Sequence, residues 1–226
     1  MIECTAKWHS TFEGGHVGVL LLSEINNSAP SSALNAKKLE LESRLREEYA
    51  HFSRQDFFEI EVLKAYRNYY KLFGNTYHVQ GQLESVVHKG KSLPSVSPLV
   101  DANFVAELDS LVLTAGHDAD LLEPPLFIDA TQDGEAFTQM NGKEKQLKVN
   151  DMMMRDAKGI VCTILYGQDK RTPISPKTKR ALYVSYAPAG VKKEDVQKQL
   201  ELIRQNVLLF APAAVTEMLE IHAAQG

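Results

Sequence analysis

Five short strand-like runs between residues 126 and 167 restrict the fold more than any other feature of the chain. They read LFIDATQ, EAFTQM, KQLKV, DMMMRD and GIVCTILYG, and Asp-Gly, Asn-Gly and Asp-Ala-Lys-Gly turn signals separate them. Runs of this length between glycine-containing turns are typical of neighbouring antiparallel strands. This part of the chain is therefore predicted to form mainly β-sheet.

Helical patterns lie on both sides of this sheet region. Apolar residues spaced by three or four predict helices over 34–52, 57–74, 82–90, 99–112 and, at the end of the chain, within 192–224. Two strand-like runs around Glu13, Gly14 and Gly15 predict a hairpin or a tight connection between strands near the amino terminus. The predicted fold class is mixed α/β, and we expect one domain over 1–226 with the C-terminal helices packed on it.

Composition excludes several classes of protein. The chain has 226 residues, of which 44% are hydrophobic, so it can bury a full core, yet no apolar run approaches the roughly 18 residues of a membrane helix. No secretion signal opens the sequence, so a cytoplasmic location is expected. The two cysteines, Cys4 and Cys162, are far apart and no ligand cluster accompanies them, so no metal or cofactor is expected.

Common catalytic motifs are also absent from the sequence. It contains no P-loop, no dinucleotide-binding glycine fingerprint, no nucleophile elbow and no HExxH motif. The net charge of −4 is unlike that of a general nucleic-acid binder, although a local basic patch can still bind phosphates. Candidate sites must therefore be sought among polar residues that interrupt an otherwise apolar or turn pattern.

The first such interruption is the stretch LVDAN, in which Asp101 and Asn103 lie within an apolar helical pattern after Pro98. Asp101 could cap the start of this helix, where the helix dipole favours a carboxylate, or it could bind a ligand. Asn103 could be a hydrogen-bonded amide of the core or an amide offered to a ligand. The sequence leaves both alternatives open.

The second interruption is TAGHDADLLE, which places His117, Asp118 and Asp120 within four residues. One imidazole and two carboxylates could bind a metal or form an acid–base pair. A surface turn with Asp side chains capping its backbone would require the same residues.

The third is the loop between two predicted strands at 166–184. It carries Asp169, the hydroxyl residues Thr172 and Thr178, and a cationic set that includes Lys170, Arg171 and Lys177. Loops carried by a rigid sheet often hold functional groups, so these cations could contact phosphates, or they could form a solvated face.

These motifs occur in an order that resembles a known family. The stretch from KAYRNYYKLFG through LVDAN and GHDAD, followed by GEAF and then DMMMRDAKGIVCTILYGQDKRTPISPKTK, is similar to the free-standing B3/B4 domain family. The same kind of domain occurs in the β subunit of phenylalanyl-tRNA synthetase. The resemblance implies a sandwich-like β core with packed helices. The histidine and glutamate of the synthetase editing site have Ala115 and Val184 at the nearest positions here.

The resemblance implies a protein that hydrolyses the ester of a mischarged tRNA. Its expected partner is the aminoacylated 3′ end of tRNA, and it is expected to bind neither a membrane nor DNA. Its catalytic residues would be Asn103, His117, Asp118 and Thr172. Its substrate-binding residues would be Asp101, Asp120, Asp169 and Thr178. Its tRNA-binding residues would be Lys170, Arg171 and Lys177. A non-catalytic module that binds tRNA or an amino acid, or an unrelated small-molecule enzyme on the same fold, would use similar residue types.

Overall fold

The structure is a computed structural model that describes residues 2–28 and 30–225. Its helices confirm the helical patterns of the first half of the chain. They are α2 (Ser32–Glu48), α3 (Glu61–Leu72), preceded by a short 3-10 turn η1 (Asp56–Glu59), α4 (His78–Lys89) and α5 (Pro98–Ser110). α4 ends at Gly90, which adopts the left-handed conformation that favours glycine. α6 (Lys193–Leu208) follows the last predicted loop.

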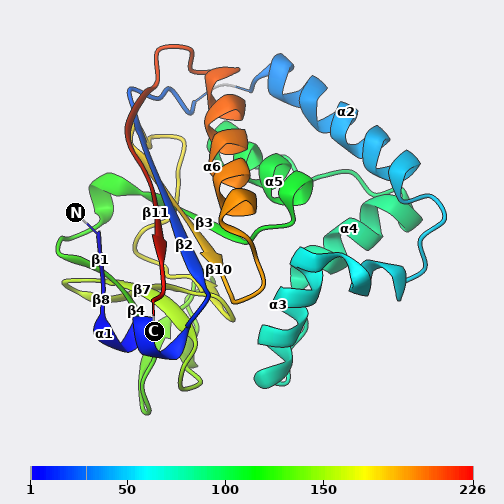
Figure 1. Cartoon of the computed structure of the whole chain (residues 1–226). Helices are drawn as coiled ribbons and strands as arrows, with labels where there is room; N and C mark the ends of the chain where they lie inside the picture. Colours follow the sequence, from blue (N-terminus) through cyan, green and yellow to red (C-terminus); the bar gives the residue numbers. More distant parts are fainter. Residues whose placement is uncertain (1, 29, 226) are drawn as a thin grey trace.

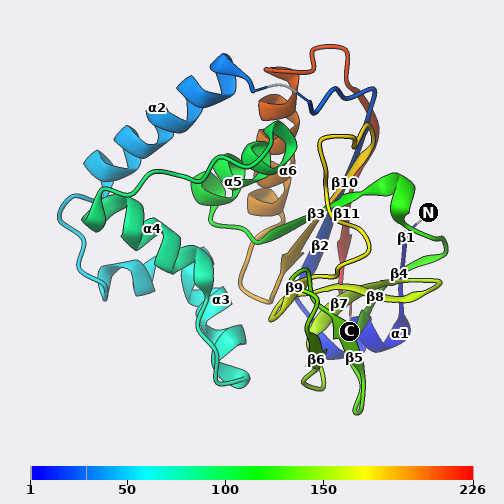
Figure 2. The ribbon, with the colours of Figure 1, turned by 180° about the vertical axis from the view of Figure 1, so that it is seen from behind.

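The predicted strands of residues 126–167 form most of a five-stranded sheet of order β1-β4-β7-β8-β9. Its strands are β1 (Ile2–Cys4), β4 (Leu126–Ala130), β7 (Met152–Asp156), β8 (Gly159–Thr163) and β9 (Gly167–Gln168). Only β1 and β4 pair in parallel. A separate hairpin of β5 (Ala136–Thr138) and β6 (Glu144–Gln146) projects beside this sheet (Figure 2).

A second sheet has four strands in the order β11-β2-β10-β3, all antiparallel. They are β2 (His16–Ser23), β3 (Thr114–Asp118), β10 (Ala181–Ala187) and β11 (Val215–Ala223). α6 packs against β2, where a Cβ added to Gly18 would clash with Val196 of the helix. α5 lies beside α6, while α2, α3 and α4 form a helical layer on the side away from the five-stranded sheet (Figure 1).

One hydrophobic cluster includes side chains from both sheets and from the helical layer. The structure therefore confirms a mixed α/β fold with a sheet core and packed helices. One domain over 1–226 stays a prediction. In the described part of the chain, no helix is both long enough and apolar enough to cross a membrane.

The predicted amino-terminal hairpin is wrong in its first arm. Residues Ala6–Thr11 form α1, a short helix that Thr5 caps by accepting a hydrogen bond from the Trp8 N–H, and the Trp8 side chain is fully buried. Burial of Trp8 against the sheets outweighed the strand-like pattern of this run.

The predicted helix over the last residues is also wrong. Val215–Ala223 form β11, which pairs along the whole of β2. The apolar residues of this stretch fit a period of three or four nearly as well as a period of two, and pairing with the free edge of β2 decides between them. Of the C-terminal region within 192–224, only Lys193–Leu208 is helical.

The segment around His117 differs from the surface turn weighed for it. Thr114–Asp118 form the edge strand β3, and His117 is fully buried. The turn comes directly afterwards as the 3-10 helix η2 (Ala119–Leu121), which Asp118 caps by accepting a hydrogen bond from the Asp120 N–H. Asp capping is therefore present, and the histidine lies before the turn.

Candidate functional site

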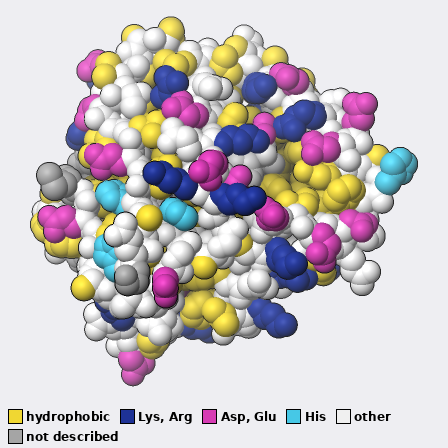
Figure 3. All heavy atoms as spheres, in the orientation of Figure 1, with side chains coloured by type: hydrophobic (Ala, Val, Ile, Leu, Met, Phe, Trp, Pro, Cys, Tyr) yellow, Lys and Arg dark blue, Asp and Glu magenta, His cyan; other side chains and the backbone are white. Residues whose placement is uncertain are grey.

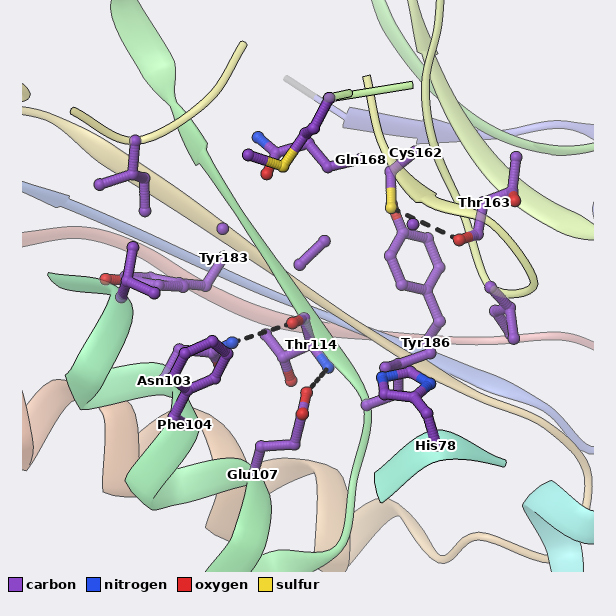
Figure 4. Close-up of a pocket in the computed structure, with 18 of the residues that line it drawn as sticks. His78, Asn103, Phe104, Glu107, Thr114, Cys162, Thr163, Gln168, Tyr183 and Tyr186 are labelled. Carbon is purple, nitrogen blue, oxygen red and sulfur yellow. Dashed lines mark hydrogen bonds between the residues drawn. The ribbon is translucent and has the colours of Figure 1, made fainter. Parts of the chain in front are cut away.

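A cavity of about 510 Å³ lies beside β3, the edge strand of the four-stranded sheet. α5 forms one wall, β3 and β10 form the floor, and the end of β8 with the loop after it forms the far wall (Figure 4). Most of its lining is apolar. The polar or titratable side chains that line it are His78, Gln82, Asn103, Glu107, Thr114, Cys162, Thr163, Gln168, Tyr183 and Tyr186.

Two polar side chains reach the cavity from neighbouring turns of α5. Asn103 and Glu107 are four residues apart, so they lie on one face of the helix. The Asn103 Nδ2 donates to the Thr114 carbonyl at 3.0 Å, and Glu107 Oε2 accepts from the Thr114 N–H at 3.0 Å (Figure 4). The pair therefore satisfies the outward-facing backbone groups of an edge strand that would otherwise lack partners.

The Asn103 amide is left with one unsatisfied atom. The Nδ2 of the amide donates to the Thr114 carbonyl, which fixes the orientation of the amide. Its Oδ1 is buried and has no hydrogen-bond partner among the described residues. Only 8% of the residue is exposed. A buried acceptor without a partner costs about 1–3 kcal/mol, which a ligand that donates a hydrogen bond would recover.

Burial raises the pKa of Glu107 to about 7, although the hydrogen bond from the Thr114 N–H opposes this rise. The carboxyl group therefore changes its charge near neutral pH. None of the described lining residues is a lysine or an arginine. The cavity thus offers acceptors and a titratable carboxyl group, and it has no fixed positive charge.

Tyr186 on β10 supplies a second unsatisfied group, in the floor of the cavity. It is 1% exposed, and its hydroxyl has no hydrogen-bond partner of good geometry in the described chain. The Cys162 thiol lies beside it and is a weak partner at best. Burial raises the pKa of this thiol far above its usual range, so Cys162 is not a nucleophile here.

A buried polar cluster adjoins the cavity on the other side of Gln168. Asp169 Oδ1 accepts hydrogen bonds from both the N–H and the hydroxyl of Thr172, at 3.0 and 2.7 Å. The Thr172 hydroxyl lies 2.8 Å from His117 Nδ1, and the Gln168 Nε2 lies 3.2 Å from the same nitrogen. Burial lowers the pKa of His117 to about 3, so the ring is neutral.

Comparison with known proteins identifies the family. The B3/4 domain profile matches residues 65–207, which include every residue that lines the cavity. This chain belongs to the B3/4 domain family. A crystal structure of an N-terminal fragment of the phenylalanyl-tRNA synthetase beta subunit from Pyrococcus horikoshii is similar, with 10% identity and a TM-score of 0.49. The match covers 98% of this chain and 50% of that fragment, and no curated protein matches.

The B3/4 chain brings together the two segments that the sequence singles out. Residues from 96–116 and from 162–174 line the same cavity, and Asn103 is the one predicted site residue in its lining. His117, Thr172 and Asp169 form the adjoining cluster instead. Gln168 connects the two regions, because it lines the cavity and its Nε2 donates to the Thr172 carbonyl at 2.7 Å.

Asp101 has a structural environment. Its carboxylate pairs with the buried Lys38 ammonium at 3.1 Å and accepts a hydrogen bond from the Val96 N–H, so it joins α2 to the start of α5. It borders a smaller hollow of about 340 Å³, outside the main cavity. Asp101 lies in the first turn of α5, whose N-cap is Ser97, so the helix dipole favours its charge although it does not cap the helix.

Three further predicted residues also lie outside the cavity. Asp118 accepts a hydrogen bond from the Thr178 hydroxyl at 2.6 Å, which fastens the loop over 167–180 to β3. Both side chains are buried, whereas Asp120 is exposed on η2. Neither His117 nor Asp118 has the access to the cavity that a water-holding role requires, because each is directed into contacts between β3 and the loop.

The three predicted tRNA-binding cations divide into two kinds. Arg171 pairs with the buried carboxylates of Asp156 and Asp169, both at 3.0 Å, so it is committed within the protein. Lys170 and Lys177 are exposed, and neither forms an ion pair with another described side chain. On the face shown in Figure 3, Lys and Arg are interspersed with Asp and Glu and form no continuous basic stripe.

Sequence reasoning missed Glu107, Gln168 and Tyr186. Glu107 carried a usable signal, since a carboxylate one turn after Asn103 in an apolar helix repeats the same interruption. Gln168 and Tyr186 carried none, because a glutamine in a loop and a tyrosine in a strand are ordinary there. Across residues 2–28 and 30–225, no group of His, Cys, Asp and Glu side chains has the geometry of a metal site.

Proposed function

We propose that this B3/4 protein binds the aminoacylated 3′ end of a tRNA in the cavity beside β3 and hydrolyses its ester, acting on mischarged tRNA in the cytoplasm. The observation that carries this proposal is the combination of an apolar cavity, the unpartnered Asn103 Oδ1 and the absence of lysine and arginine from the described lining. The resemblance of the motifs to the editing domain of the synthetase adds to it.

The charge pattern favours an ester over a free amino acid. A free amino acid carries a carboxylate, and burying that group without a cation is costly. An aminoacyl ester carries an ammonium group and a neutral carbonyl instead. Asn103 Oδ1 can accept from the ammonium group, and the apolar walls around Val100, Phe104 and Ile174 can hold the amino acid side chain.

Glu107 is the best candidate for the group that activates water. A general base works best with a pKa close to the working pH, and burial brings the pKa of Glu107 to about 7. Water would lose a proton to the carboxylate and add to the ester carbonyl carbon. The bond to the ribose 3′ oxygen would then break, and that oxygen would take up the proton.

The decisive experiment follows deacylation of a panel of mischarged tRNAs by the wild-type protein and by Glu107→Gln. We expect at least one tRNA to be hydrolysed by the wild type, and the variant to lose about 100-fold or more in rate while it still binds that tRNA. Glu84→Gln on α4, outside the cavity lining, is the matched control and should retain the wild-type rate.

The second candidate is a non-catalytic module that holds the same aminoacyl end. One observation favours it: Glu107 already accepts a hydrogen bond from the Thr114 N–H, which is a sufficient structural reason for a carboxyl group at this position. Binding of aminoacyl-tRNA without hydrolysis of any member of the panel would support this candidate and reject the hydrolase.

A further inference from the structure

We infer that the backbone N–H of Gly116, at the outer edge of β3, is a substrate-binding donor that takes the carbonyl oxygen of the aminoacyl group, while Asn103 Oδ1 accepts from the ammonium group. This inference rests on the proposed function and names the contacts by which the site would hold its substrate.

The direction of the Gly116 N–H follows from its neighbours in the strand. The Thr114 N–H donates to Glu107, and the Asp118 N–H donates to the Thr172 carbonyl, so both turn away from β10. Successive N–H groups of a strand point alternately to its two sides. Gly116 lies between these two residues, so its N–H also turns away from β10.

Gly116 lines the cavity, and its N–H lies on the outer edge of β3, which the loop joins at the next residue through the bridge between His117 and Pro173. On that side of β3, no backbone hydrogen bond among the described residues has the Gly116 N–H as its donor. The unpartnered Asn103 Oδ1 belongs to the same edge, because the other end of that amide binds the Thr114 carbonyl. The cavity lining therefore includes both a backbone donor from Gly116 and an acceptor from Asn103.

A glycine is required at this position for a steric reason. A Cβ on residue 116 would lie 2.8 Å from the Ile174 side chain and 3.0 Å from the Tyr183 ring. Both of these side chains line the cavity. The missing side chain therefore allows the walls to close on the strand while the backbone of Gly116 remains in the cavity lining.

The ligand chemistry follows from this pair of groups. A ligand must present an acceptor to the Gly116 N–H and, close to it, a donor to Asn103 Oδ1. An α-aminoacyl group has this arrangement, with a carbonyl oxygen and an ammonium group on adjacent carbons. A backbone donor on a rigid strand can also stabilise the negative charge that develops on the carbonyl oxygen during ester hydrolysis.

The test removes the N–H without adding a side chain. Cell-free synthesis would place glycolic acid at position 116, which replaces the amide N–H by an ester oxygen, and a matched control would carry the same change at Gly134 in an exposed turn. The probes are 3′-deoxyadenosines that carry L-valyl, L-leucyl or L-phenylalanyl groups through a stable 3′-amide. Each has a partner probe in which a methylene replaces the carbonyl.

Calorimetry should show that glycolate at position 116 lowers the affinity for the tightest-binding carbonyl probe about 10-fold. The affinity for its methylene partner should change by less than about 2-fold. A 10-fold difference corresponds to roughly 1.4 kcal/mol of coupling. The control should bind both probes as the wild type does. An equal loss for both probes, no loss for either, or no binding to the wild type would overturn the inference. Coupled binding without hydrolysis of any mischarged tRNA would support it and reject only the hydrolase.

Discussion

The two sides of β3 differ in how completely their buried polar groups are satisfied. Towards α5 and α6, the side chains of Ser110, Thr114, Ser185 and Gln199 form a continuous network with hydrogen bonds of 2.7 to 2.9 Å. Towards the cavity, Asn103 Oδ1 and the Tyr186 hydroxyl remain without partners. Every side chain of the network has a partner, whereas these two groups of the cavity lining have none.

The polar groups that stabilise the fold and those available to a ligand therefore lie on opposite sides of the same strand. A satisfied buried network contributes to stability and is costly to interrupt, whereas an unsatisfied group already carries its desolvation cost in the free protein. Substitutions on the two sides of β3 should therefore have opposite profiles. One side should lose stability and keep binding, and the other should do the reverse.

The largest loss of stability is expected on the satisfied side. Gln199→Leu removes the acceptor of the Ser110 hydroxyl and the donor to Thr114, so the free energy of unfolding should fall by roughly 2–4 kcal/mol. Urea denaturation measures this change, and Gln197→Leu on the more exposed side of α6 is the matched control. A loss of less than about 0.5 kcal/mol would show that the network is not a structural unit.

Glu107 connects the two sides, and its effect depends on pH. The pKa of the carboxyl group is raised from 4.5 in the unfolded chain to about 7 in the folded protein, so the folded protein keeps a proton that the unfolded chain releases. Its contribution to stability is therefore present below pH 4.5 and is lost as pH rises to 7, by up to roughly 3 kcal/mol.

Glu107→Gln should remove this dependence. The stability of the variant should equal that of the wild type near pH 4.5 and should exceed it above pH 7. Thermal melts of both proteins across this range measure the difference. Burial also raises the pKa of Asp151 to about 6, and because that residue is present in both proteins its effect cancels. A constant difference across the range would place the pKa of Glu107 in its ordinary range.

On the unsatisfied side, Asn103→Ala should cost no more than about 1 kcal/mol of stability, since it removes one hydrogen bond and one unpartnered oxygen. The same substitution should abolish binding of the aminoacyl probes. Melting temperature and calorimetric titration, run on one preparation, decide between the roles. A large drop in melting temperature with unchanged binding would make Asn103 a structural amide.

The fold was predictable where periodicity is unambiguous. The helices α2 to α5 and the strands from β4 to β8 follow from spacing and turn signals, and α4 even ends at its predicted glycine. The two errors, α1 and β11, lie where a short run fits more than one pattern. There, long-range contacts decided: burial of Trp8 in one case, and pairing with the edge of β2 in the other.

The site was predictable only in part. Asn103 stood out because an amide in an apolar helix needs a partner, and in the structure it lines the cavity. His117, Asp118 and Thr172 are equally polar, yet their partners come from segments 55 to 60 residues away in sequence. Local sequence does not show whether a distant segment will supply the hydrogen-bond partner of a polar group. It therefore could not show that these three side chains have partners within the protein while the Asn103 oxygen has none.

The smallest effect on stability is expected at the rim, where the loop over 167–180 runs beside the cavity. Lys170→Ala with Lys177→Ala should leave the free energy of unfolding within about 0.5 kcal/mol, because neither ammonium group pairs with another described side chain. If both contact tRNA phosphates, the slope of log affinity against log salt should fall by about 1.5. Lys64→Ala with Lys71→Ala on α3 is the matched control.

Arg171 must not be substituted in this test. Its loss would leave the buried Asp156 and Asp169 without their cation, so a loss of stability could be mistaken for a loss of binding. An unchanged salt slope in the double variant would remove this loop from the tRNA-binding surface and leave the cavity as the only proposed point of contact.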